Sequence, residues 1–291
     1  MIEPYILIQE RLLMLSIFSQ IHDSFLYHIN HGTGYFTIPK FDETGLVHHC
    51  FSTRQGGYSH GECSTLNLGL KRNDDKNNVT RNFQKICECI EVDFKHLVLS
   101  DQIHQNKVYP VTEKDQGKGI CQLSDIIGVD SLITDTHGIP LATFYADCVP
   151  IFFLDPIHKA IGTAHAGWRG IIQDIAKETL MQMNIEFGTR PNECLVGIGP
   201  SIGVCCFEVG SDVADVFSQT FTQKDIVLQA NDGKHSIDLW KACIMQLLNA
   251  GIIAKNITVS NLCTKCNSKL FFSHRREHGH TGSLAAIIQL I

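Results

Sequence analysis

The sequence predicts a layered α+β domain in which short β-hairpins alternate with helices. Three apolar runs in the centre of the chain, at residues 139–146, 149–154 and 159–165, are separated only by short breaks that contain Asp or Pro. Such short breaks favour antiparallel hairpins over crossover connections. Segments with helical periodicity lie on both sides of this centre, and no repeat or linker divides the chain. We therefore expect one layered domain.

The N-terminal part is expected to begin with an extension over residues 1–45, which contains an apolar stretch of helical character near its start. The domain, residues 46–291, should open with a strand at 46–52. A helix is predicted over 78–90, with Asn78 as a candidate N-cap. Its apolar residues recur at helical spacing: Val79, Phe83, Ile86 and Ile90.

The C-terminal half alternates helices with strands. A helix is predicted over 170–187, because apolar residues recur there at intervals of three and four and Gly188 marks a stop. A buried strand at 194–198 runs into a sharp loop at 199–203 that contains two glycines and a proline. Two further helices and one strand are expected at 212–219, 239–250 and 257–260.

Composition excludes some classes of function. The 291 residues carry a formal net charge of −6 and no basic stripe, so we expect no nucleic-acid binding. An apolar run at 12–18 is too short to span a bilayer and lacks the cleavage pattern of a signal peptide, so we expect no membrane association. Twelve cysteines and fifteen histidines then indicate reduced thiols and a metal site in a cytoplasmic protein.

Three residues form a candidate metal site. Cys148 stands at the junction of two predicted strands, His165 ends a strand before a small-residue turn, and His104 follows the apolar run at 97–100. Two imidazoles and one thiolate hold zinc and leave a coordination position open. Taken singly, each residue is weak support for a metal site, because a structural role in the core or on the surface is the more common one; the site depends on the three residues converging.

A second cysteine motif is weaker. Cys263 and Cys266 have the spacing of half a zinc ribbon, but no second Cys-x-x-Cys is present, and Cys205 and Cys206 are adjacent rather than spaced. The sequence therefore gives little support to a four-cysteine site.

Charged residues beside these motifs are candidates for substrate contacts. Arg54 and Arg169 lie next to glycines, where a planar guanidinium can pair two oxygens of a phosphate; the alternative is a solvated surface arginine. Asp147 and Glu208 are candidate acids or bases in catalysis, although either equally fits a turn residue that accepts backbone hydrogen bonds.

Several strings along the chain resemble the YfiH/YlmD laccase-domain family. The match runs from about residue 46 to the C-terminus, and the string His-Ala-Gly-Trp-Arg-Gly at 165–170 is nearly diagnostic. Ser283 departs from the family pattern, which has an arginine there. The other matching strings lie at 54–59, 66–69, 102–104, 130–134, 146–150, 199–209 and 272–276.

This resemblance implies a four-layer α/β/β/α single domain with zinc held by His104, Cys148 and His165. It also implies phosphorolysis of purine nucleosides, namely inosine, guanosine, adenosine and methylthioadenosine, with adenosine deamination as a companion activity. We accordingly expect purine nucleosides and phosphate as partners, Asn67 in substrate binding beside the two arginines, and a monomer or weak homodimer.

Two other readings of the same residues stay open. Older labels for the family describe copper-dependent polyphenol oxidases, and two His with one Cys is also the equatorial set of a blue-copper site, but the chain lacks the additional ligands of a multicopper centre. Alternatively, Cys148 with His165 as its base forms the nucleophilic dyad of a hydrolase or deamidase.

Overall fold

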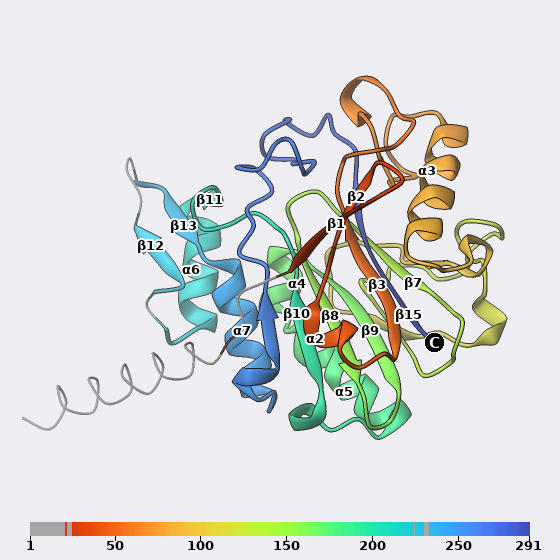
Figure 1. The fold of residues 1–291 in the computed structure, drawn as a ribbon. Coiled ribbons are helices and arrows are strands. Elements are labelled where there is room, and N and C mark those ends of the chain that lie inside the picture. The colour runs from red at the N-terminus through yellow and green to blue at the C-terminus, as the bar shows by residue number, and fades with distance from the viewer. Residues whose placement is uncertain (1–20, 22–24, 224, 230–232) are drawn as a thin grey trace, which may run out of the picture.

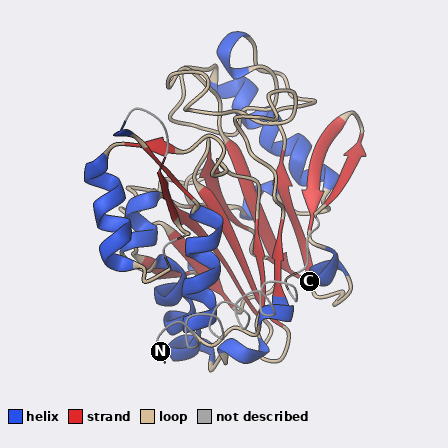
Figure 2. Ribbon diagram, turned by 90° about the vertical axis from the view of Figure 1, so that its left-hand side faces the viewer, coloured by secondary structure: helices blue, strands red, loops and turns tan. Residues whose placement is uncertain are grey.

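The computed structural model describes residues 21, 25–223, 225–229 and 233–291. Two six-stranded sheets pack face to face, and helices cover the outer face of each (Figures 1 and 2). The predicted four-layer α/β/β/α domain is confirmed. The apolar stretch near the start of the chain lies outside the described residues. No helix in the described ranges is long and apolar enough to cross a membrane.

The first sheet places the C-terminal strand in its middle. Antiparallel partners of β15 (Leu284–Leu290) are β3 (Val47–Ser52) on one side and β7 (Leu141–Tyr145) on the other. The remaining strands, in sheet order, are β1 (Leu26–Asn30) and β2 (Thr33–Thr37) beyond β3, and β4 (Val98–Leu99) beyond β7. Both β1 and β2 come from the segment expected as an extension, so this part of it packs with the domain.

Helix α3 (Lys76–Cys89) covers the outer face of the first sheet. Its buried stripe contains Val79, Phe83 and Ile86, as the periodicity predicted. The predicted cap at Asn78 is wrong, because the helix begins two residues earlier and the Asp75 side chain accepts from the Asn77 N–H.

The second sheet has the order β14 (Ile257–Val259), β10 (Leu195–Ile198), β8 (Val149–Asp155), β9 (Ala160–Ala166), β6 (Ser131–Thr134) and β5 (Val108–Pro110). The β8–β9 hairpin is antiparallel, as predicted. The expectation that β7 and β8 also form a hairpin is wrong. Strand β7 pairs in the first sheet, so the chain crosses between the sheets at residues 146–148.

Helices on the outer face of the second sheet lie close to their predicted positions. They are α4 (Trp168–Ile172), α5 (Ile175–Phe187), α6 (Ser211–Thr220) and α7 (Leu239–Asn249). The single helix predicted over 170–187 is in fact two, because Asp174 adopts a left-handed conformation with φ of 59° and interrupts the helical hydrogen bonds.

The layers are held together by three apolar clusters. Between the sheets, Phe51, Tyr145 and Phe152 are buried, and each such side chain contributes about 1.5–3 kcal/mol. Smaller elements complete the fold: α2 (Pro39–Asp42), a three-stranded sheet of β11 (Glu208–Val209), β13 (His235–Ile237) and β12 (Val227–Gln229), and 3-10 turns at Gly61–Cys63, Phe94–His96, Glu113–Asp115, Pro191–Glu193 and Ala254–Asn256.

Candidate functional site

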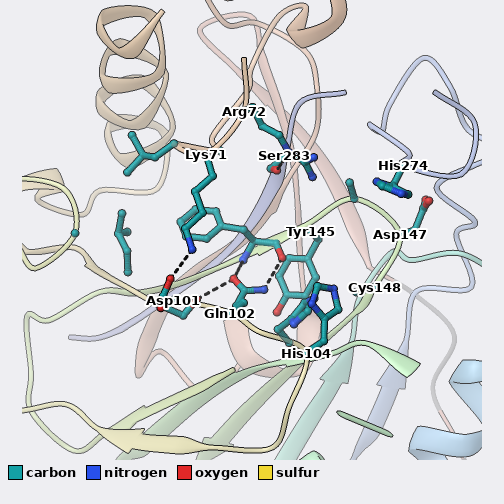
Figure 3. A pocket seen from close by; sticks show the side chains of 18 of the residues that line it. Lys71, Arg72, Asp101, Gln102, His104, Tyr145, Asp147, Cys148, His274 and Ser283 are labelled. Carbon is teal, nitrogen blue, oxygen red and sulfur yellow. Dashed lines mark hydrogen bonds and ion pairs between the residues drawn. The ribbon is translucent and has the colours of Figure 1, made fainter. Parts of the chain in front are cut away.

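A cavity of about 760 Å³ lies where the chain passes between the two sheets (Figure 3). Its wall is assembled from segments far apart in the sequence, around residues 69–72, 99–104, 124–127, 144–148, 202–207 and 274–283. A cavity of this size accommodates a small-molecule substrate.

His104, Cys148 and His165 meet in the wall of this cavity. Their ligand atoms all lie within 4.8 Å of one another, and the two imidazole rings contact edge to face with centroids 4.8 Å apart. Strand register explains the approach of two members, since Pro150, two residues after Cys148, pairs with His165 across the β8–β9 hairpin. The structure thus brings together the three residues that the sequence singled out.

Gly167 makes room for this cluster. A Cβ at this position would lie 2.9 Å from His104 Cδ2 and 3.4 Å from Cys148 Sγ. The first distance is shorter than real Cβ contacts, so any other residue would displace the His104 ring. A glycine is therefore required in the turn after His165, because a side chain there would collide with the His104 ring.

Asp130 fixes the orientation of both histidines. One carboxylate oxygen, Oδ1, accepts from His165 Nδ1 at 2.8 Å and from the His104 backbone N–H at 3.0 Å. The other, Oδ2, accepts from the N–H groups of Ile103 at 3.1 Å and Gln105 at 2.9 Å. A carboxylate on Nδ1 leaves Nε2 of His165 as the atom available to a metal or a thiol.

The charges within the cluster stabilise one another. Burial raises the pKa of Cys148, but the positive charge of His165 and hydrogen bonds from His104 and His165 outweigh it and lower the pKa to about 6. Burial lowers the pKa of His165, but the Cys148 thiolate and Asp130 raise it to about 9. The thiolate is the form that binds metals and attacks electrophiles.

Basic side chains line another part of the cavity. Arg72 donates from Nε to Ser283 Oγ at 2.8 Å, and Lys71 forms an ion pair with Asp101 (Figure 3). An arginine was expected at position 283, and here Arg72 brings a guanidinium to Ser283 from another loop. His274 also lines the cavity. This region suits an anionic group of a ligand.

Asp147 lines the cavity at the point where the chain changes sheets. Its φ of 96° is in the left-handed region, and its carboxylate holds two loops. Oδ1 accepts from Thr264 Oγ1 at 2.6 Å and Oδ2 from the Arg275 N–H at 2.7 Å. Asp147 therefore lies within reach of a ligand and also fixes the backbone beside Cys148.

Four other predicted site residues lie outside the cavity wall. Arg54 pairs with Glu277 at 2.9 Å and covers the Phe272 ring at 4.5 Å, whereas Arg169 is exposed and stacks on Trp168 at 4.3 Å. Glu208 is exposed and pairs with Lys234 at 2.7 Å.

Asn67 has an indirect connection to the cavity. Its Oδ1 accepts from the N–H groups of Gly69 at 2.9 Å and Ser283 at 2.8 Å, and both of these residues line the cavity. Asn67 thereby shapes the region around Arg72 without lining it.

Sequence reasoning missed Asp130, Tyr145 and Arg72 as residues of the site. Asp130 directly precedes β6, whose four residues are all buried, and a charge placed beside such a strand has to be paired, which is a usable signal. Tyr145 is buried against the His165 ring at 5.6 Å between centroids and donates to the Ala164 carbonyl at 2.9 Å. Arg72 carries no local signal that distinguishes it from a surface arginine.

The family profile described as multi-copper polyphenol oxidoreductase laccase matches residues 48–291. The chain belongs to this family. Members with curated names are similar over most of the chain. Purine nucleoside phosphorylase YlmD of Geobacillus stearothermophilus is 37% identical over 240 residues, which cover 81% of this chain and 88% of that protein. A purine nucleoside phosphorylase of Bacteroides thetaiotaomicron is 34% identical over 246 residues, 84% of this chain and 90% of that protein.

Solved structures of the laccase family share the fold. The crystal structure of YlmD from Geobacillus stearothermophilus superimposes with a TM-score of 0.86 at 35% identity, over 92% of this chain and 99% of that one. The crystal structure of the hypothetical protein YfiH from Bacillus licheniformis gives a TM-score of 0.84 at 33% identity, over 91% and 99%. The four-layer architecture of this laccase-family chain is thus that of its relatives.

Proposed function

We propose that the protein is a zinc-containing purine nucleoside phosphorylase. The observation that carries the proposal is a His–Cys–His cluster in the wall of a cavity that also presents a guanidinium and a carboxylate. Relatives named purine nucleoside phosphorylase support the reaction class. Inosine, guanosine, adenosine and methylthioadenosine are the proposed substrates, with phosphate as the second substrate.

The cavity offers different surroundings to the parts of such a substrate. Leu99, Ile126 and Phe144 form an apolar wall for the flat purine base. Arg72 and His274 provide cationic or hydrogen-bonding groups for phosphate. Because the apolar wall and these polar groups line the same cavity, one cavity can hold the nucleoside and phosphate together, which favours reaction by orientation.

Phosphorolysis joins a phosphate oxygen to C1′ of the ribose while the bond from C1′ to the purine nitrogen breaks. The base leaves with the electron pair of that bond and takes up a proton, so it needs a nearby acid. Asp147 lines the cavity and Glu208 does not, so we assign proton transfer to Asp147. Arg72 orients the phosphate and balances its charge.

Two imidazoles and a thiolate fit zinc, since zinc accepts nitrogen and sulfur ligands and a three-ligand site leaves a position for substrate or water. Asp130 provides the carboxylate–histidine contact typical of zinc sites. When bound, zinc supplies Lewis-acid chemistry, which suits the companion deamination of adenosine. His104, Cys148 and His165 would hold the metal, and Asp130 accepts hydrogen bonds from the His165 ring and the His104 backbone.

Product analysis tests this proposal. Inosine incubated with the purified protein should yield hypoxanthine and ribose 1-phosphate only when phosphate is present. Adenosine should also yield inosine or hypoxanthine, and chelation of the metal should abolish that branch first. Base release at an equal rate without phosphate would instead identify a nucleosidase, and no turnover of any purine nucleoside would refute the proposal.

A second candidate is a hydrolase or deamidase that uses Cys148 as nucleophile. The observation in its favour is the thiolate–imidazolium pair of Cys148 and His165, with Asp130 as the group that orients the base. Metal-depleted protein separates the two candidates. It should lose phosphorolysis if the metal is required, whereas a cysteine nucleophile would keep its activity without metal and lose it on alkylation by iodoacetamide.

Copper remains the alternative metal, because the family profile is named for it and the same donor set occurs in blue-copper sites. In the described part of the chain, just two groups of three or more His, Cys, Asp or Glu side chains gather at ligand distance, and together they contain only two histidines. A trinuclear copper centre requires more histidines, so we favour zinc. Metal analysis with a polyphenol oxidation assay distinguishes the two.

A further inference from the structure

We propose a second metal site, built from Cys205, Cys206, Cys263 and Cys266, that holds zinc in a structural role. It shares no ligand with the His104–Cys148–His165 cluster and does not rest on the proposed function. The four sulfur atoms all lie within 4.8 Å of one another.

The fold brings these cysteines together from two loops. Strands β10 and β14 are parallel neighbours, so the loops that follow them emerge at the same edge of the sheet. Cys205 and Cys206 lie in the loop after β10, and Cys263 and Cys266 lie in the loop after β14. A bridge between Ser201 and Cys263 joins the two loops at their start.

The sulfur separations suit one bound metal ion. Cys266 Sγ lies 3.7 Å from Cys205 Sγ and 3.4 Å from Cys206 Sγ. Zinc binds thiolates at about 2.3 Å in a tetrahedron, whose edge is then about 3.8 Å. A disulfide requires sulfur atoms about 2.05 Å apart, and all four thiols are free. The cluster is therefore preformed for a tetrahedral thiolate site.

The backbone around the cluster is adapted to sulfur. The Gly203 N–H donates to Cys263 Sγ at 3.3 Å, a contact that stabilises a thiolate. A Cβ on Gly203 would lie 3.3 Å from Cys205 Sγ and 3.4 Å from Cys263 Cβ, so glycine permits the close approach of the loops.

Two basic residues belong to the segments beside the site. Four thiolates with one zinc ion carry a net charge of about −2. Lys265 stands between Cys263 and Cys266 in the sequence, and Arg276 donates from Nη1 to the carbonyls of Thr264 at 2.8 Å and Lys265 at 3.0 Å. Arg276, which also pairs with Glu277 at 2.9 Å, thus holds the backbone of the Cys263–Cys266 loop, and Lys265 adds a positive charge to that loop.

The site acts on the cavity through the loops it joins. The loop after β10 carries Ile202 and Phe207, and the chain beyond Cys266 leads to His274 and Arg275; all four line the cavity. Arg275 also donates to the carbonyls of Cys206 at 3.4 Å and Glu208 at 2.8 Å. A bound metal would therefore hold one wall of the cavity by linking its two loops.

Metal analysis of purified full-length protein tests the site. Wild-type protein loaded with zinc and gel-filtered should retain about two zinc ions per chain, one at each thiolate-containing site. Cys266→Ser should lose the zinc of the four-cysteine site and retain about one ion. Cys148→Ala should lose the zinc of the His104–Cys148–His165 cluster and also retain about one. Cys121→Ser, which changes an exposed cysteine outside both clusters, should retain both ions and controls for the substitution itself.

X-ray absorption of the zinc that remains in Cys148→Ala protein identifies its ligands. This measurement leaves the four cysteines intact, so it does not depend on whether variants of those cysteines fold. We expect sulfur ligands alone at about 2.3 Å, with no nitrogen shell at about 2.0 Å. A Cys266→Ser variant that retains as much zinc as wild type, nitrogen ligands in this spectrum, or a disulfide among the four cysteines in mass spectra of non-reduced protein would overturn the proposal.

Discussion

Replacement of Asp130 by asparagine is the sharpest test of how the histidine cluster is built. The substitution keeps the shape of the side chain but replaces one acceptor oxygen by an NH₂ group, which donates only. Each oxygen of Asp130 accepts two hydrogen bonds, so the variant loses two of the four whichever way the amide is turned.

The magnitude follows from this count. Because a hydrogen bond to a charged group contributes about 1.5–3 kcal/mol, loss of two lowers the free energy of unfolding by about 3–6 kcal/mol. Both oxygens also hold the 103–105 turn that carries His104, and Oδ1 holds His165. Loss of such a carboxylate–histidine contact typically weakens metal binding about 10–100-fold, and we expect that range for zinc.

Two measurements separate the effects: urea unfolding of the metal-free protein, and zinc competition with a chromophoric chelator under conditions where the variant is folded. Asp155 supplies a matched control, since this buried carboxylate accepts from the N–H groups of Ile157 and His158 and from His158 Nδ1 at 2.8 Å. It lies at the far end of β8 from Cys148. Asp155→Asn should therefore lower stability but leave zinc affinity unchanged.

Folded Asp130→Asn protein that binds zinc as tightly as wild type would refute this reasoning. So would an Asp155→Asn variant that weakens zinc binding to the same extent, because the effect would then follow from general loss of stability.

Three further changes test the cavity and the fold. Gly167→Ala should push the His104 ring aside and lower zinc affinity at least about tenfold, measured by chelator competition. Arg72→Lys keeps the charge but loses the planar fork, so the phosphate KM should rise several-fold while the nucleoside KM changes little; exposed Arg169→Lys is the control. His49 is buried with its pKa lowered by burial from 6.5 to about 3, so the unfolded chain takes up a proton first as the pH falls. The contribution of His49 to stability should therefore decrease by about 2 kcal/mol from pH 7 to pH 5, so wild type should lose about that much more stability than His49→Gln over this range, as followed by urea unfolding.

Each of these has a contrary outcome. Unchanged zinc affinity in Gly167→Ala would mean that the His104 ring accommodates the added methyl group without leaving its position as a metal ligand. A larger rise of phosphate KM in Arg169→Lys than in Arg72→Lys would return the phosphate site to the arginine that the sequence favoured. A pH dependence of stability that is identical in His49→Gln and wild type would assign acid sensitivity to other groups.

Local patterns predicted the elements well and their partners less well. The helical stripe of α3 and the β8–β9 hairpin follow from spacing alone, because their contacts are local. Strand β7 has the same apolar character as β8 but pairs in the other sheet. A short break in an apolar pattern does not distinguish a hairpin turn from a crossing between layers. Local sequence patterns therefore could not predict that β7 and β8 belong to different sheets.

The site residues also divide into those that local sequence identifies and those whose role depends on contacts between distant segments. His104, Cys148 and His165 stood out by residue type, and the fold then brought them together. The role of Asp130 depends on hydrogen bonds to two segments that are distant in sequence, which composition does not reveal. The four cysteines were discounted because their spacing matches no linear motif. Two parallel strands supply the adjacency that the sequence lacks.

The position of β15 has a consequence for how the protein is made. Residues 284–290 fill the middle of the first sheet, between β3 and β7. During synthesis from the N-terminus, β3 and β7 exist long before their shared neighbour, and each then presents an unpaired apolar edge, which is a template for aggregation. The nascent chain cannot complete the sheet beneath the cavity until residue 290 has left the ribosome. The nascent chain should therefore depend most on chaperones in the interval between the synthesis of β7 and the emergence of β15.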